Sequence, residues 1–345
     1  MNKIRPIRVA ALTGGENVPS ARYRVRQLIP ALLQQGIDMR EFIPPISKYP
    51  PPQKELRPFW AFIALFGRLS SVIATYQYDV VLLQRELVST LVTFEPFTKH
   101  PRVLDVDDAI FLHRRGKFAI RLARLSELII CGNDYLAEHF IQWNKNVVVI
   151  PTGIDIKRYI PAKKNLNPQD KLIIGWIGTS GNFKYLYKIE LALEIIMNLL
   201  PDAILLVVAD KKPKFRGRLN KILEYIRWSP KTEINNIQRM TVGIMPLADT
   251  EWERGKCSYK MLQYMACGIP VVVSPVGMNT QVLSLGKAGI GAKSQDEWVN
   301  ALVALLSNDN ERKKMGISGR YIVEKYFSID VIAPRLGQQL KQVAS

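Results

Sequence analysis

Two lysines and a glutamine share one side of a predicted helix. Lys256, Lys260 and Gln263 occupy positions i, i+4 and i+7 of a helix predicted over residues 256–267. A helix dipole disfavours a cation in its first turn, so Lys256 indicates an anionic ligand. The lysines and the free backbone N–H groups would bind a phosphate or diphosphate there. The alternative interpretation is a solvated lysine face on an ordinary surface helix.

A cluster of carboxylates follows a predicted strand. Asp105, Asp107 and Asp108 lie at the end of a buried strand predicted over Arg102–Val106, and His113 follows closely. The carboxyl ends of strands in an open α/β sheet face the ligand crevice. Asp107 and Asp108 are therefore candidates to act on a substrate hydroxyl or to bind a sugar. The alternative is that either one caps a following turn. The cluster is a weak metal signal, and we predict no metal site.

Glycine-containing turns open both halves of the chain. Gly14 and Gly15 form one turn, and Gly178 with Thr179 belongs to the other. Glycine lets the backbone approach a ligand closely, and a following helix N-terminus favours anions. We predict ligand contacts at these four residues, with Lys184 as a further candidate for the phosphates or, alternatively, a solvated helix residue. Neither turn fits the dinucleotide fingerprint, so a dehydrogenase is weakly supported.

Strand-like and helical segments alternate along the chain and would position these residues. The strands predicted from short apolar runs are Ile7–Leu12, 79–84, Arg102–Val106, Leu128–Cys131, 147–150, 171–177, Ala203–Ala209, Val242–Met245 and 269–273. The helices include 23–35, 185–200, 256–267 and 296–306. This alternation predicts an α/β fold of two Rossmann-like, doubly wound parallel-sheet domains that face a cleft.

The length of 345 residues suits two domains of roughly 150 residues each. We predict an N-terminal domain over residues 1–160 and a C-terminal domain over 170–330, joined by a polar linker at 163–171. A last helix, over 331–345, is expected to return to the first domain. The proline-rich stretch 44–58 is predicted to be a mobile loop.

The composition favours an anionic partner. The chain has 48 basic and 30 acidic residues, a net charge of +18. It has no zinc-finger spacing and no RNP-type aromatic motif, which argues against nucleic acid. Its three cysteines form no CxxC pair, as expected in a reducing compartment. We find no run of the about 18 apolar residues that a spanning helix needs, and therefore expect a cytoplasmic protein.

An apolar aromatic segment, FWAFIALF, occupies residues 59–66 between Arg57 and Arg68. The favoured interpretation is a core helix of the first domain. The alternative is a helix on a membrane surface, because aromatic side chains with flanking arginines suit that interface.

Several segments, in the same order along the chain, carry a resemblance to a known family. They are PSARYRV at 19–25, DVDDAIF at 105–111, VVVIPTGID at 147–155, YMACGIPVVVSPVG at 264–277 and RKKMGISGRYIVEKYFS at 312–328. Over nearly its full length, the chain resembles the GT-B-fold glycosyltransferases, in particular family four, which is retaining and nucleotide-sugar-dependent. The segment at 264–277 is the most specific, because it is similar to that family's donor-site signature.

The resemblance implies a hexosyltransferase-type enzyme that moves a sugar from a nucleotide-diphosphate donor to an acceptor hydroxyl. The N-terminal domain would bind a saccharide or lipid-linked acceptor, positioned by Asp107 and Asp108, and the C-terminal domain would bind the donor. Lys256 and Lys260 would neutralise the leaving diphosphate in place of a metal, and no cofactor is needed. A role in cell-surface polysaccharide or glycolipid synthesis would fit peripheral contact with an anionic membrane.

The chain departs from the family pattern at the two glutamates of the donor site, which fall on Gly255 and Gln263. Gln263 could still bind the nucleotide ribose through its amide, and Glu253 could replace the missing first carboxylate. Ser258 and Tyr259 are predicted to contribute donor contacts at the start of the helix. Two alternatives stay open: a nucleotide-sugar epimerase on the same fold, and a non-catalytic nucleotide-sugar-binding member of the family.

Overall fold

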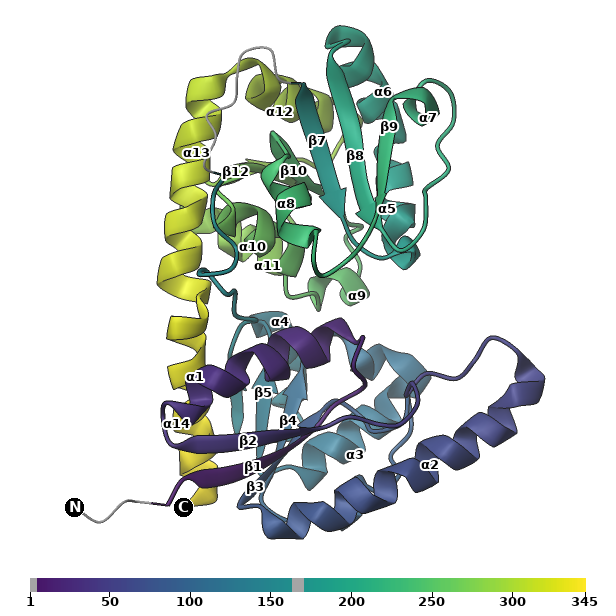
Figure 1. Cartoon of the computed structure of the whole chain (residues 1–345), viewed down its shortest axis with the longest axis vertical. Coiled ribbons are helices and arrows are strands. Elements are labelled where there is room, and N and C mark those ends of the chain that lie inside the picture. The colour runs from purple at the N-terminus through teal and green to yellow at the C-terminus, as the bar shows by residue number, and fades with distance from the viewer. Residues whose placement is uncertain (1–4, 163–170) are drawn as a thin grey trace. The chain divides into compact units, whose positions relative to one another are not determined.

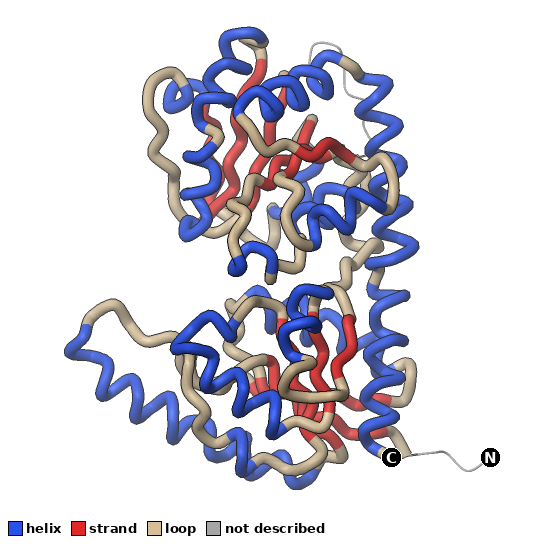
Figure 2. Tube along the Cα trace, turned by 180° about the vertical axis from the view of Figure 1, so that it is seen from behind, coloured by secondary structure: helices blue, strands red, loops and turns tan. Residues whose placement is uncertain are grey.

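The computed structural model describes residues 5–162 and 171–345, which form two α/β units (Figure 1). Unit 1 contains Met1–Gly153, Arg254–Cys257 and Ile329–Ser345, and unit 2 contains Ile154–Glu253 and Ser258–Ser328. Each unit has a six-stranded parallel sheet with helices packed on its faces (Figure 2). The predicted pair of doubly wound domains is therefore confirmed. The linker predicted at 163–171 lies, except for Lys171, outside the described residues.

The sheet of unit 1 has the strand order β2-β1-β3-β4-β5-β6. These strands are, in chain order, β1 (Ile7–Leu12), β2 (Ile37–Phe42), β3 (Val80–Gln84), β4 (Arg102–Val106), β5 (Leu128–Cys131) and β6 (Val147–Val149). The helices are α1 (Ile29–Leu33), α2 (Arg57–Ala74), α3 (Lys117–Leu125), α4 (Asp134–Phe140) and α14 (Ile329–Ala344). The central strands are buried on both faces, which is why their sequences are nearly continuous apolar runs.

The C-terminal helix α14 completes the core of unit 1. Ile332, Leu336 and Leu340 pack with Leu28 and Leu32 against one face of the sheet. The segment before α1 is a π-helical turn (Ala21–Val25) followed by a 3-10 turn (Arg26–Leu28). The single helix predicted over 23–35 is therefore wrong. Pro30 has no N–H to donate one turn back and is favoured in the first turn of a helix, which agrees with the start of α1 at Ile29.

The sheet of unit 2 has the strand order β12-β11-β10-β7-β8-β9. Its strands are β7 (Leu172–Ile177), β8 (Ala203–Ala209), β9 (Leu223–Arg227), β10 (Val242–Met245), β11 (Val271–Val273) and β12 (Gly289–Gly291). Its helices are α5 (Phe183–Lys188), α6 (Glu190–Leu199), α7 (Leu219–Ile222), α8 (Glu233–Gln238), α9 (Glu251–Arg254), α10 (Tyr259–Ala266), α11 (Met278–Ser284), α12 (Gln295–Ser307) and α13 (Asp309–Ile322). Trp176 and Trp298 lie fully inside its core.

Two helix predictions for unit 2 need correction. The helix predicted over 185–200 is divided into α5 and α6, because Ile189 leaves helical geometry and its N–H bonds Leu186 in a tighter turn. The helix predicted from residue 256 begins only at Tyr259. Ser258 precedes it in the left-handed conformation, with φ 51°, and so separates Lys256 from the helix.

Helix α2 is not the core helix that we favoured for residues 59–66. Phe59, Phe62 and Phe66 are 68%, 60% and 53% exposed. The preceding proline-rich stretch is also more ordered than a mobile loop, since Lys48 is buried and the Trp60 indole donates to the Ser47 carbonyl at 2.8 Å. By length and composition alone, the helical stretch over residues 54–77 is long and apolar enough to cross a membrane, which the sequence count of apolar residues had not indicated.

Candidate active site

The topology of unit 2 indicates that a ligand would bind at the carboxyl ends of β7 and β10. The chain proceeds from β7 to β8 and β9 on one side, then returns to build β10, β11 and β12 on the other. Ligands bind in open α/β sheets where the strand order reverses in this way. The residues that follow these two strands are Gly178–Ser180 and Pro246–Thr250.

Lys260 and Gly178, predicted separately, come together at this reversal point. The Lys260 ammonium lies 4.7 Å from the centroid of the Trp176 ring, which holds the cation by a cation–π contact. A Cβ atom added to Gly178 would lie 2.8 Å from Lys260 Nζ, so glycine leaves the space that the ammonium uses. The turn continues through Thr179 to Ser180, whose hydroxyl donates to Asp210 at 2.7 Å. A cation and a glycine turn thus meet where an anionic ligand is expected.

Glu253 and Lys184 also lie together in unit 2. The Glu253 carboxylate is buried, accepts hydrogen bonds from the Tyr185 and Thr250 hydroxyls, and lies 3.8 Å from Lys184 Nζ. Burial alone would raise its pKa, but the Thr250 and Tyr185 hydroxyls, a backbone hydrogen bond and the Lys184 charge together hold the pKa of Glu253 below its ordinary value. Glu253 is therefore an ionised group whose position is fixed from within unit 2.

The residues predicted around the start of α10 have different surroundings. The Ser258 hydroxyl donates to Asn279 Oδ1 at 2.6 Å. Gln263 is only 4% exposed, and its amide nitrogen donates to the Tyr159 hydroxyl at 2.9 Å and to Glu233. The structure thus gives Gln263 protein partners where we predicted a ribose contact. Tyr259 occupies the first position of α10.

Lys256 belongs to a strap, defined here as residues 254–257, that packs in unit 1. Asn133 donates its side-chain N–H groups to the backbone carbonyls of Arg254 and Lys256, at 3.2 and 3.0 Å. Gly255 approaches Ala109 so closely that an added Cβ would lie 2.8 Å from the Ala109 Cβ. The predicted placement of Lys256 in the first turn of a helix is therefore wrong, because these contacts hold the residue in a loop.

Unit 1 brings Lys256 to the predicted carboxylates. Arg85 Nη1 lies 2.9 Å from Asp108 and 3.6 Å from Asp107, and the Lys256 charge also acts on Asp108. Burial and the neighbouring Asp107 raise the pKa of Asp108 to about 6, although Arg85 and Lys256 oppose this shift. Asp107 and Asp108 remain partly exposed, at 14% and 27% of their side chains. This arrangement suits carboxylates that hold a substrate hydroxyl.

A buried ion pair that we did not predict lies next to Gly14. Lys48 Nζ is 3.3 Å from the Glu86 carboxylate, and a Cβ on Gly14 would lie 3.1 Å from the Lys48 side chain. Burial, with a further contribution from Arg85, lowers the pKa of Lys48 to about 8 against the opposing effect of Glu86. The pair lies beside the reversal point of unit 1, at the carboxyl ends of β1 and β3. No local signal marks Lys48, because its partners come from distant strands.

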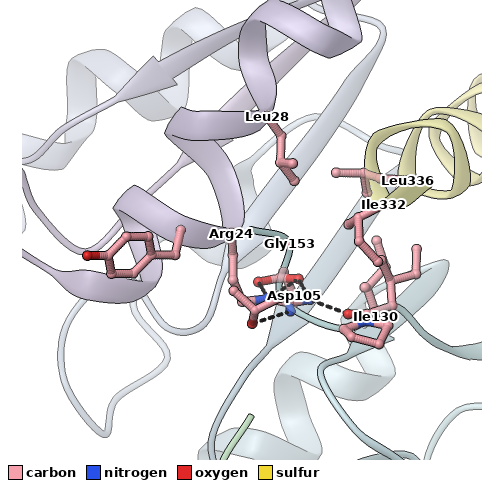
Figure 3. A pocket seen from close by; sticks show the side chains of 11 residues that line it. Arg24, Leu28, Asp105, Ile130, Gly153, Ile332 and Leu336 are labelled. Atoms are coloured by element: carbon pink, nitrogen blue, oxygen red, sulfur yellow. Dashed lines mark hydrogen bonds and ion pairs between the residues drawn. The ribbon is translucent and has the colours of Figure 1, made fainter. Parts of the chain in front are cut away.

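A second ion pair that we did not predict, between Arg24 and Asp105, accounts for the third carboxylate of the cluster at 105–108. Arg24 donates hydrogen bonds to the Asp105 carboxylate from Nε and Nη2, and the shorter of the two is 2.6 Å. It also donates to the Thr152 hydroxyl and to the Ile150 carbonyl. Figure 3 shows this pair at one side of a small pocket that Leu28 and Leu336 close on the other. Asp105 is therefore engaged by Arg24 inside unit 1, while Asp107 and Asp108 are partly exposed beside Arg85.

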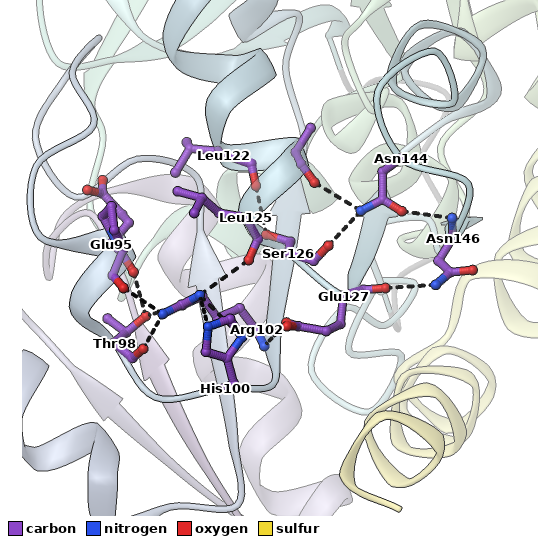
Figure 4. A network of polar contacts seen from close by, with 12 residues as sticks. Glu95, Thr98, His100, Arg102, Leu122, Leu125, Ser126, Glu127, Asn144 and Asn146 are labelled. Atoms are coloured by element: carbon purple, nitrogen blue, oxygen red, sulfur yellow. Dashed lines mark hydrogen bonds and ion pairs between the residues drawn. The ribbon is translucent and has the colours of Figure 1, made fainter.

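A further polar network lies away from the site. Arg102, at the amino end of β4, donates to Thr98, Pro96 and Leu125, and its backbone N–H donates to Glu127 (Figure 4). Since ligand crevices form at carboxyl ends, this network joins loops and takes no part in the candidate site. Within the described residues, no group of three or more His, Cys, Asp or Glu side chains is placed to hold a metal ion.

Residues 173–308 match the family described as Glycosyl transferases group 1. A curated relative, the D-inositol 3-phosphate glycosyltransferase of Corynebacterium urealyticum (strain ATCC 43042 / DSM 7109), is 24% identical over 195 residues. This match spans 49% of the chain and 45% of that enzyme, so the two share just under half of the relative's length.

Similar solved structures cover nearly the whole chain. Sucrose-phosphate synthase from Thermosynechococcus elongatus has a TM-score of 0.70 and 18% identity, over 97% of this chain and 98% of its own. Anabaena Alr3699/HepE in complex with UDP-glucose has a TM-score of 0.66 and 14% identity, over 97% and 100%. The chain therefore has the GT-B fold, and residues 173–308, which include the segment 264–277, are similar to the group 1 glycosyltransferases, in agreement with the resemblance seen in the sequence.

Proposed function

We propose that this protein is a glycosyltransferase that moves a sugar from a nucleoside-diphosphate donor to an acceptor hydroxyl. The observation that carries the proposal is the meeting of Lys260 with the Gly178 turn at the strand reversal of unit 2. The group 1 domain at 173–308 covers the same elements. The similar Anabaena protein binds UDP-glucose, which supports a nucleotide sugar as donor.

Lysines take the electrostatic role in the proposed reaction. Lys260 and Lys184, both in unit 2, neutralise charge that develops on the leaving diphosphate. The bond from the anomeric carbon to the diphosphate oxygen breaks, and a bond to the acceptor oxygen forms. The acceptor proton passes to the leaving diphosphate. We propose that the reaction retains the anomeric configuration and needs no metal.

The acceptor belongs to unit 1 in this proposal. Asp107 and Asp108, which follow the carboxyl end of β4, hold the acceptor hydroxyl. A saccharide or lipid-linked acceptor fits a role in cell-surface polysaccharide or glycolipid synthesis. Such acceptors would place the protein in the cytoplasm, at the inner face of the membrane.

A second candidate function is a non-catalytic protein that binds a nucleotide sugar. It is favoured by Gly255, which provides no carboxylate, and by Gln263, whose amide nitrogen is engaged inside unit 2. Such a protein would bind the nucleotide but would release no nucleoside diphosphate with any acceptor. An active transferase would do both.

The test is a thermal-shift screen against UDP, GDP, ADP, CMP and their sugars, with and without magnesium. We expect one nucleoside diphosphate to stabilise the protein without metal. Lys260→Ala should weaken its binding by about tenfold or more, because a charge-assisted contact is lost. Lys314→Ala is the matched control, since this lysine lies exposed on α13. If no nucleotide stabilises the protein, or if both variants bind equally well, the proposed donor site is wrong.

A further inference from the structure

Helix α2 presents an apolar stripe to the solvent. Its large apolar residues Phe59, Phe62, Phe66 and Ile73 are 68%, 60%, 53% and 68% exposed, and the exposed Ser70 lies between the last two. They are separated by three, four and seven positions, so they share one face of the helix. A surface helix of a soluble domain normally shows polar residues on this face, and an exposed apolar stripe that Ser70 alone interrupts marks an interaction surface.

The side of α2 that faces the sheet carries an arginine. Arg68 is 1% exposed and donates to the backbone carbonyls of Thr13, Phe42 and Leu87. Pro45 also packs so closely on the helix that a Cβ at Gly67 would lie 2.5 Å from its ring. The helix is thus fixed to unit 1 through Arg68, and its apolar stripe is not available to the core. This corrects the sequence interpretation, in which Arg68 flanked an exposed aromatic segment.

A basic surface lies on helix α3 and on the turn before it. Five exposed cations occur here without any acidic residue from 109 to 126: Arg114, Arg115, Lys117, Arg121 and Arg124. The opposite side of α3 is apolar and buried, so these cations are directed away from the sheet. Arg114 and Arg115 both have positive φ, 48° and 56°. Two successive non-glycine residues in this costly conformation are typical of a site where strain serves a function.

The apolar stripe and the basic surface lie on the same side of the sheet. The connections from β2 to β3 and from β4 to β5 run in the same direction across the sheet, so their right-handed crossovers put α2 and α3 on one face. Helices α1 and α14 pack in the core of the opposite face (Figure 1). Exposed aromatic side chains of α2 and exposed cations of α3 therefore both lie on this one face of the sheet.

We propose that α2 and the basic surface of α3 dock this protein on an anionic lipid bilayer. Phenylalanine and isoleucine side chains enter the boundary between headgroups and acyl chains, and the arginines and lysine attract anionic headgroups. The helix lies in the plane of the interface and does not span the bilayer, because Arg68 ties it to the sheet of unit 1. A second copy of the chain fits less well, since a symmetric contact would bring two basic surfaces together.

The docking surface is independent of the sugar transfer proposed above, and its test needs no enzyme assay. The wild-type chain is sedimented with phosphatidylcholine vesicles and with vesicles that contain about one-third phosphatidylglycerol. We expect binding to the anionic vesicles that weakens as salt screens the arginines. The triple variant Phe59→Ser/Phe62→Ser/Phe66→Ser should lower the partition coefficient by about tenfold or more. Arg121→Glu/Arg124→Glu should abolish the preference for anionic lipid.

The control is Ile317→Ser/Tyr321→Ser, which removes two exposed apolar side chains from α13 in unit 2, 73% and 57% exposed. Circular dichroism verifies that each variant folds. The proposal is overturned if the wild type ignores anionic vesicles, or if the α2 variant binds them as well as the α13 control does. It is also overturned if light scattering shows a dimer that the α2 changes dissociate, because the stripe would then be a contact between copies.

Discussion

Gly255 occupies the position at which the family pattern has its first glutamate, and its surroundings exclude a side chain there. An added Cβ would lie 2.8 Å from both the backbone N and the Cβ of Ala109. Gly255→Glu, which restores the family residue, should therefore lower the free energy of unfolding by at least about 1–3 kcal/mol through overpacking. Urea denaturation measures the change.

Gly181→Ala is the matched control for this prediction. A Cβ at Gly181 meets no atom within 4 Å, and the residue has no positive φ. Its stability should stay within about 0.5 kcal/mol of the wild type. Equal stability of Gly255→Glu and Gly181→Ala would show that the strap does not hold Gly255 against Ala109.

Asp108 should make activity depend on pH around its raised pKa of about 6. If its carboxylate holds the acceptor hydroxyl, kcat/KM should rise about tenfold per pH unit below pH 6 and level off above pH 7. Asp108→Asn should be much less active and should lose this rise. The measurement is kcat/KM from pH 5 to 8, with the nucleotide sugar identified by thermal shift. The same rise in Asp108→Asn would assign the ionisation to another group.

Asp108 should affect stability and activity in opposite directions as the pH rises: activity increases, and its contribution to the free energy of unfolding decreases. Its pKa in the folded state lies above the ordinary value near 4, so between about pH 4 and 6 the folded protein keeps a proton that the unfolded chain releases. This group therefore favours folding most below pH 4, and its contribution declines as the pH rises through 6. Partial exposure of the side chain moderates the effect.

At the scale of elements, the sequence predicts best what local pattern determines. The central strands β1, β4, β5, β8 and β10 agree with their predicted bounds, because a strand buried on both faces is a short apolar run. The edge strands β2 and β9 were not predicted. Asp38, Arg40 and Glu41 interrupt β2 with polar residues, which an edge strand tolerates.

The site was predicted less well, because contacts between distant residues determine it. Lys256 has helical spacing with Lys260, yet Asn133 and Ala109 hold it outside the helix. Lys48 lies within a proline-rich stretch but is buried against Glu86. Pairings of this kind depend on the order of strands in the sheet. The spacing of residues along the chain does not predict that order. Lys260 and Gly178 were predicted individually because each carries a local signal.

At the scale of the whole molecule, unit 1 is assembled from both ends of the chain. Helix α14 inserts Ile332, Leu336 and Leu340 into the core formed by the first 153 residues. Each buried side chain contributes about 1.5–3 kcal/mol, so their joint loss is comparable with the whole stability of a domain. Deletion of residues 329–345 should therefore unfold unit 1 and leave unit 2, which contains none of these residues, folded.

Scanning calorimetry checks this prediction through the unfolding enthalpy, which scales with the number of folded residues. The deletion should remove roughly half of the wild-type enthalpy, since unit 1 holds about half of the chain. Deletion of residues 341–345 alone is the control, because they are exposed or, at Val343 and Ala344, only partly buried at the edge of the core. A full enthalpy after removal of residues 329–345 would mean that the N-terminal sheet closes its core without α14. The segment would then be an appendage of unit 1 and not part of its folding unit.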